Sequence, residues 1–168
     1  MIASGTHGTP VPESIPAGAN AVIESEAQKA SLLDVPQRTI LYVEDNPVNL
    51  QLVSQILELR PDLRLLAAVD GHLGIESARH HHPDVILMDL NLPGISGTDA
   101  MRILQTDPTT ASIPIIAFSA NAIPSGFEKG PTGGFFGYIS KPIRIKLFWE
   151  ALDAALNFSR IPSPSAAK

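Results

Sequence analysis

Several residue types and patterns are missing from this chain, and each absence removes a class of protein. There is no cysteine, which excludes disulfides and thiolate zinc sites and suits a reducing compartment. The net charge of −5 offers no basic surface for nucleic acid. No apolar run approaches the length that crosses a bilayer, and the N-terminus lacks the pattern of a secretory signal. We therefore expect a cytoplasmic protein that binds no nucleic acid and makes no membrane contact through this segment.

The chain is long enough for one ordinary domain with tails, at 168 residues. Residues 1–36 are rich in Pro, Gly, Ser and Ala, which predicts a flexible linker. Residues 37–160 are predicted to form the folded domain. Residues 161–168, with two further prolines, are predicted to form a disordered tail.

Short β-type runs alternate with segments of helical periodicity along the domain. The predicted strands are 39–43, 63–69, 85–89, 113–118 and 135–139, and the predicted helices include 47–59, 73–80, 98–105 and 143–158. Ile103 and Leu147 are expected on the buried faces of the last two of these helices. The alternation predicts an α/β fold, with a five-stranded, doubly wound parallel sheet and helices on both of its faces.

The segment between the fourth and fifth predicted strands is a poor helix former. Residues 122–134 are AIPSGFEKGPTGG. An interior Gly costs about 1 kcal/mol relative to Ala, and an interior Pro about 3 kcal/mol. We therefore expect a shortened fourth helix from about Pro124 to Lys129, followed by a flexible loop to Phe135.

Polar residues stand where the predicted strands end. They are Glu44, Asp45, Asp89, Ser119 and Lys141. Carboxyl ends of parallel strands form the ligand crevice of an open sheet, so these side chains should meet. Two carboxylates 4 Å apart repel by about 4 kcal/mol at an effective dielectric near 20, which implies a divalent cation among them. An all-oxygen ligand set favours Mg2+ or Mn2+.

This set of residues also predicts phosphoryl chemistry. Lys141 supplies one mobile positive charge and Ser119 one hydroxyl, which together suit a tetrahedral oxyanion such as phosphate. The chain shows no Ser-His-Asp constellation, so the nucleophile would be a carboxylate, and Asp89 can form an aspartyl phosphate. The alternative role for Asp89 is a helix N-cap, although Ser96 is better placed for that.

A run of three histidines, His80-His81-His82, offers a second candidate metal site. The alternative is that imidazoles near the C-terminus of a predicted helix interact favourably with its dipole. We favour the alternative, because adjacent residues on a helix do not share a face.

Four segments together resemble the receiver domain of two-component signalling. They are YVEDNPVN, VILMDLNLPGISG, IIAFSAN and YISKPI, in the family's order and spacing, within about 37–160. The resemblance implies a flavodoxin-like fold and a phosphoacceptor domain rather than an enzyme. It also implies that the donor is a histidine kinase or a histidine phosphotransfer domain, and that phosphorylation could produce a homodimer.

The resemblance also assigns roles to particular residues. It implies that Asp89 is the phosphoacceptor, that Glu44 and Asp45 hold the metal, and that the main-chain carbonyl of Asn91 completes the metal site. Ser119 and Lys141 correspond to the residues that contact the phosphoryl group. Two further correspondences are the family's usually cis proline, at Pro142, and the aromatic whose rotamer reports phosphorylation, at Tyr138.

Glu44 is a mild departure from the family's commoner Asp. The motifs are most like those of the receiver of a hybrid sensor histidine kinase, in which a flexible linker often joins the receiver to the ATP-binding domain. A stand-alone receiver would look similar. Two other functions remain open. A magnesium-dependent phosphohydrolase of aspartyl-phosphate type would usually carry an acid where this chain has Asn91, and an inert interaction module would be expected to lack Asp45, Asp89 or Lys141.

Overall fold

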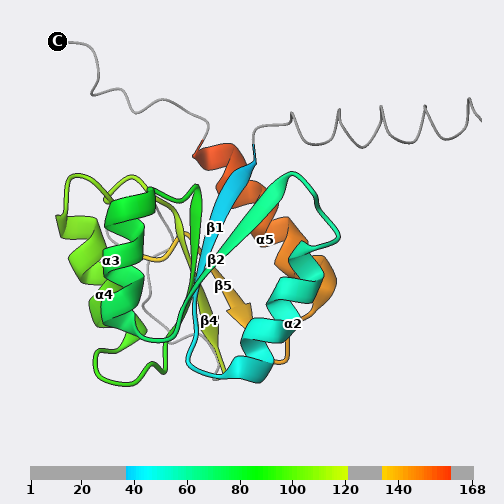
Figure 1. The fold of residues 1–168 in the computed structure, drawn as a ribbon, viewed down its shortest axis with the longest axis horizontal. Helices are drawn as coiled ribbons and strands as arrows, with labels where there is room; N and C mark the ends of the chain where they lie inside the picture. The colour runs from blue at the N-terminus through cyan, green and yellow to red at the C-terminus, as the bar shows by residue number, and fades with distance from the viewer. Residues whose placement is uncertain (1–36, 121–133, 160–168) are drawn as a thin grey trace, which may run out of the picture. The chain divides into compact units, whose positions relative to one another are not determined.

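The computed structural model describes residues 37–120 and 134–159. These residues form a sheet covered by helices (Figure 1). The strands are β1 (Arg38–Val43), β2 (Leu63–Ala68), β3 (Val85–Asp89), β4 (Ile115–Ser119) and β5 (Gly137–Ser140). The helices are α2 (Pro47–Leu57), α3 (Gly71–His81), α4 (Gly97–Thr106) and α5 (Ile145–Phe158). Each boundary lies within two residues of its prediction.

The sheet is parallel throughout, in the order β2-β1-β3-β4-β5. The chain therefore moves outward from β1 in one direction and then in the other, which is the doubly wound topology that the sequence predicts. The expected linker 1–36, the shortened fourth helix 124–129 and the tail 161–168 lie outside the described residues.

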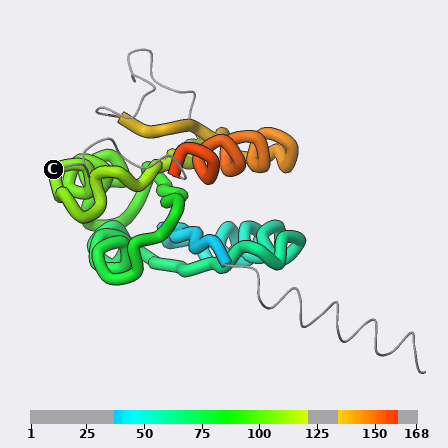
Figure 2. The backbone as a smooth tube through the Cα atoms, turned by 90° about the horizontal axis from the view of Figure 1, so that it is seen from above, coloured from blue at the N-terminus to red at the C-terminus, as the bar shows by residue number. Residues whose placement is uncertain are grey.

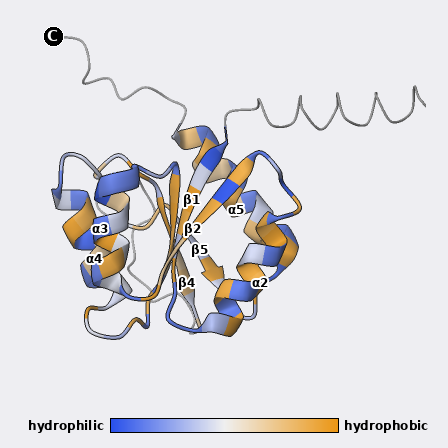
Figure 3. Cartoon of the chain, viewed as in Figure 1, coloured by the Kyte–Doolittle hydropathy of each residue, from blue (hydrophilic) through white to orange (hydrophobic). Residues whose placement is uncertain are grey.

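Successive side chains of each strand point to opposite faces of the sheet, and they form one hydrophobic core on each face. On one face, Tyr42 and Phe118 pack against α2 and α5. On the other face, Val43 and Met88 pack against α3 and α4. Figures 1 and 2 show these helix pairs on opposite sides of the sheet, and Figure 3 shows the apolar strands between them.

Local capping residues begin three of the helices. Asn46 caps α2, with Pro47 at its first position, and Asp70 caps α3. Ser96 caps α4 by accepting a hydrogen bond from the backbone N–H of Asp99. Ser96 therefore fills the capping role at α4 that was the alternative assignment for Asp89.

Two apolar residues lie outside the cores, contrary to their predicted burial. Ile103 is 39% exposed and Leu147 is 44% exposed. Each stands next to a fully buried apolar residue, Leu104 or Phe148. Adjacent residues on a helix point in directions about 100° apart, so only one of each pair can lie at the centre of the buried face.

Candidate metal and phosphoacceptor site

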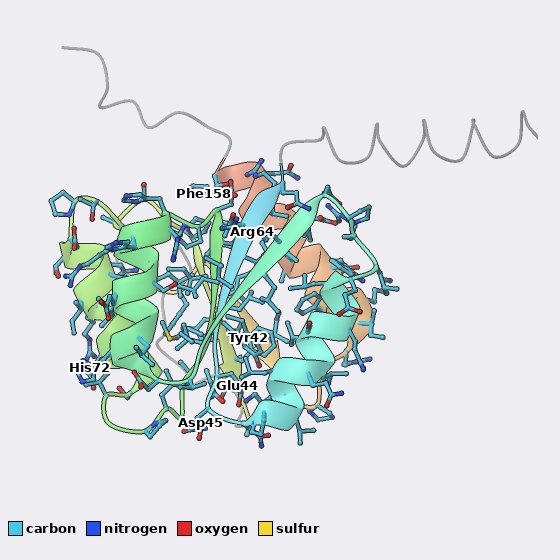
Figure 4. The ribbon with its side chains drawn as sticks, in the orientation of Figure 1. Tyr42, Glu44, Asp45, Arg64, His72 and Phe158 are labelled. Carbon is cyan, nitrogen blue, oxygen red and sulfur yellow. The ribbon has the colours of Figure 1, made fainter. Side chains whose placement is uncertain are left out.

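The register of the sheet brings the predicted site residues to one edge. Val43 pairs with Met88, so Glu44, which directly follows β1, and Asp89, the last residue of β3, lie at the same level. Ser119 pairs with Ser140 at the ends of β4 and β5, and Lys141 follows. Figure 4 shows Glu44 and Asp45 at this carboxyl end of β1.

Three of these side chains form a cluster of carboxylates. Oxygens of Glu44, Asp45 and Asp89 lie within 4.8 Å of one another. Glu44 and Asp89 are buried, whereas Asp45 is exposed. In the part of the chain that the structure describes, no other group of three or more acidic or histidine side chains meets in this way. The spacing and the all-oxygen chemistry fit a hard divalent cation such as Mg2+.

The side chain of Lys141 contacts two of these three acids. Its Nζ donates to Oδ2 of Asp89 at 2.5 Å and to Oε2 of Glu44 at 2.7 Å. Burial alone would lower the pKa of Lys141, but its hydrogen bonds to these two acids outweigh burial and raise it. The ammonium therefore stays charged and neutralises part of the cluster. The peptide bond between Lys141 and Pro142 is cis, as the resemblance implies.

Glu44 is held by donors on both of its carboxylate oxygens. Oε2 accepts from the hydroxyl of Tyr42 at 2.7 Å as well as from Lys141. Oε1 accepts from the side-chain amide of Asn49 at 2.9 Å. Burial alone would raise the pKa of Glu44, but the hydrogen bonds from Lys141, Asn49 and Tyr42 lower it. The carboxylate is therefore stabilised in its charged form.

Sequence reasoning missed Tyr42 and Asn49. Both residues stand within the segment YVEDNPVN, but no role at the site was assigned to either of them. A signal was available for Tyr42, because residues two apart in a strand project from the same face, and Glu44 follows Tyr42 at that spacing. Burial first, and then the hydrogen bond to Glu44, raise the pKa of Tyr42, so its hydroxyl remains a donor.

The turn after β3 fixes the position of Asp89. Its Oδ1 accepts from the backbone N–H of Asn91 at 2.9 Å. Gly97 packs against the same stretch, since a Cβ at this position would lie 2.0 Å from the carbonyl oxygen of Asp89. The close approach excludes any larger residue at position 97 unless the backbone moves.

The remaining predicted residues occupy separate places. Ser119 is the buried last residue of β4. Tyr138 lies in β5 against Phe135, and burial raises its pKa. His80 and His81 lie in the last turn of α3, which fits the dipole interpretation.

Comparisons with known proteins agree with this geometry. The family model for the response regulator receiver domain matches residues 40–153. The polar-differentiation response regulator DivK of Brucella ovis is 35% identical over 119 residues, which are 71% of this chain and 96% of DivK.

Two solved structures share the fold. One is the receiver domain of a sensor histidine kinase of Pseudomonas aeruginosa PAO1, with a magnesium ion coordinated in its active site cleft. It is 31% identical to this chain, with a TM-score of 0.64, and the match covers 72% of this chain and 98% of that one. The other is a sensor protein of Polaromonas sp. JS666, 26% identical, with a TM-score of 0.66 and coverage of 74% and 99%.

A doubly wound parallel sheet with acids and a lysine at its carboxyl edge defines an α/β domain of flavodoxin-like architecture. The chain belongs to the response regulator receiver domain family of two-component signalling. In the described residues, no helix is long and apolar enough to span a membrane.

Proposed function

We propose that this chain is a signalling switch that accepts a phosphoryl group on Asp89 in the presence of Mg2+. The observation that carries the proposal is the constellation at the carboxyl edge: a buried Asp89 next to two further carboxylates and in contact with the charged Lys141. These groups supply a nucleophile, an oxygen-lined cation site and a positive charge for the phosphoryl oxygens.

The proposed reaction moves the phosphoryl group from a phosphohistidine to a carboxylate. A carboxylate oxygen of Asp89 forms the new O–P bond while the P–N bond of the donor breaks, and the leaving imidazole nitrogen keeps the electron pair and takes up a proton. Lys141 then pairs with a phosphoryl oxygen instead of with Asp89. Ser119 donates a hydrogen bond to another phosphoryl oxygen.

Glu44, Asp45, Asp89 and the main-chain carbonyl of Asn91 are the proposed holders of the cation. The ion, when bound, supplies positive charge that offsets the repulsion between the carboxylates and the incoming phosphoryl group. Mn2+ would satisfy the same ligands. The buried acids and their donors preorganise this set before the ion arrives.

The proposed donor is a histidine kinase or a histidine phosphotransfer domain, and the proposed compartment is the cytoplasm. Residues 37–160 are the proposed switch domain, with 1–36 as a linker and 161–168 as a tail. A hybrid sensor kinase is the proposed context, supported by the similar receiver from a sensor histidine kinase. A change to a homodimer on phosphorylation would be visible by size-exclusion chromatography with and without beryllofluoride.

The decisive test is intact-mass analysis after incubation with acetyl phosphate and Mg2+. We expect one phosphoryl addition on the full chain and none on Asp89→Asn. The matched control is Asp153→Asn, since Asp153 is an exposed acid of α5 that contacts Arg60 and not the cluster. A phosphoryl addition on Asp89→Asn, or none on the unaltered chain, would contradict the proposal.

A further inference from the structure

Two neutral side chains, besides Lys141, donate hydrogen bonds to the carboxylate of Glu44. Tyr42 donates from within β1, two residues before Glu44, and Asn49 donates from the first turn of α2. The two donors engage different oxygens of the carboxylate, and Tyr42 shares its oxygen with Lys141. Figure 4 shows Tyr42 in β1 and Glu44 just beyond the carboxyl end of that strand.

The hydroxyl of Tyr42 is not needed for packing. Its ring fills the core on the α2 and α5 face, with its centroid 5.3 Å from that of Phe118. A phenylalanine would fill the same space. The hydroxyl adds a polar group to a residue that is fully buried, and it is satisfied by the hydrogen bond to Glu44.

Asn49 serves the other oxygen from a different element. Its side chain is half-buried, and its amide reaches back from α2 to Oε1 of Glu44 at 2.9 Å. The backbone N–H of Asn46 approaches the same oxygen at the longer distance of 3.4 Å. The two neutral side-chain donors thus hold different oxygens of the carboxylate, one from the sheet and one from the helix.

We propose that Tyr42 and Asn49 are positioning residues of the metal site, which hold the carboxylate of Glu44 in the orientation that binds the cation. The inference rests on the proposed function, in which Glu44 helps to hold Mg2+. Both donors are neutral, so removing either one leaves the formal charge of the site unchanged and removes one hydrogen bond that orients the carboxylate. Hydrogen-bond partners of metal ligands contribute in this way, and their loss typically weakens metal binding by a factor of 10–100.

The experiment is a calorimetric titration of the full chain with Mg2+. Tyr42→Phe keeps the ring, and Asn49→Ala keeps α2, because Ala favours a helix more than Asn does. We expect each variant to raise the dissociation constant about tenfold. The control is Gln51→Ala, at an exposed position of the same helix. We expect this variant to leave the dissociation constant for Mg2+ unchanged.

A double-mutant cycle separates positioning from a general structural effect. In a Glu44→Gln background the carboxylate that both donors orient is gone, so Tyr42→Phe and Asn49→Ala should then change the constant by less than twofold. An equal fold-change in both backgrounds would overturn the proposal, as would unchanged or tighter binding by the single variants. If Tyr42→Phe did not fold, Asn49→Ala would decide alone.

The same titration distinguishes this inference from the proposed function. An unaltered chain that took up no Mg2+ would refute the metal part of the proposed function and this inference with it. If the unaltered chain and both single variants bound Mg2+ with the same dissociation constant, the inference would be refuted and the proposed function would stand.

Discussion

Each end of the sheet carries charged side chains gathered around one base, and the charges balance only in the group around Arg38, at the amino end. There Arg38 donates to Asp84 at 2.6 Å, to the carbonyl of Leu156 at 3.0 Å and to the hydroxyl of Ser159 at 2.6 Å. The other oxygen of Asp84 accepts from the backbone N–H of Thr39 at 2.7 Å. One base meets one acid, and the result ties β1 to β3 and to the end of α5.

At the carboxyl end, three acids share one lysine. Glu44 and Asp89 contact Lys141, and Asp45 lies within the same cluster. The cluster keeps a net negative charge and places two of its acids away from water. The ion pair at the amino end is therefore complete by itself, whereas the cluster at the carboxyl end has a charge that a bound cation would balance.

Removing the single base at each end gives the largest expected difference. Lys141→Ala removes the ammonium that pairs with two buried carboxylates. In the absence of divalent ions, we expect the unfolding free energy to fall by about 3 kcal/mol. Arg38→Ala should cost only about 1 kcal/mol, because Asp84 is more exposed and keeps its backbone donor. Urea unfolding of both variants measures the two losses.

The same two variants can be compared after adding Mg2+. Lys141→Ala should recover part of its loss, since the cation replaces the missing positive charge among the acids. Arg38→Ala should gain no more than the unaltered chain does. Equal losses at both ends, insensitive to Mg2+, would remove the proposed distinction between them.

Mg2+ itself should act only through the carboxyl end. Binding to the folded state alone adds about 2.7 kcal/mol when the ion is present at a hundred times its dissociation constant. Asp45→Ala should remove most of this increment, whereas Arg38→Ala should keep it. Thermal unfolding with and without the ion measures both effects, and a melting curve indifferent to the ion would contradict a metal site.

The sequence predicted the sheet and its acidic edge because both depend on local patterns. Runs such as Val85–Asp89 have a clear period and clear ends, and a parallel sheet necessarily gathers its strand ends at one edge. The place of Ser96 as the cap of α4 followed from side-chain chemistry alone. These features need no knowledge of distant contacts.

The features that escaped prediction depend on packing between elements. Whether Ile103 or Leu104 turns inward is decided by the angle at which α4 meets the sheet, and no local pattern states that angle. The reach of Asn49 from α2 to Glu44 depends on where the helix begins relative to the strand.

The smallest predicted effect concerns His82, at the amino end of the sheet, where a substitution should stabilise the protein. His82 follows α3 in a left-handed conformation, with φ 43° and ψ 62°, and its side chain is exposed. A left-handed conformation costs an L-residue about 1–2 kcal/mol, and glycine avoids this cost while losing about 0.5–1 kcal/mol of backbone entropy on folding. His82→Gly should therefore gain about 0.5 kcal/mol in urea unfolding.

The matched control is His80→Gly, two residues earlier on the same helix. His80 is exposed and helical, so glycine there has no left-handed strain to relieve and should cost roughly 0.5 kcal/mol. A gain in unfolding free energy for His82→Gly and a loss for His80→Gly would confirm that glycine is favoured at the end of α3, at position 82. A loss of stability in both would mean that His82 makes a contribution that its conformation does not explain.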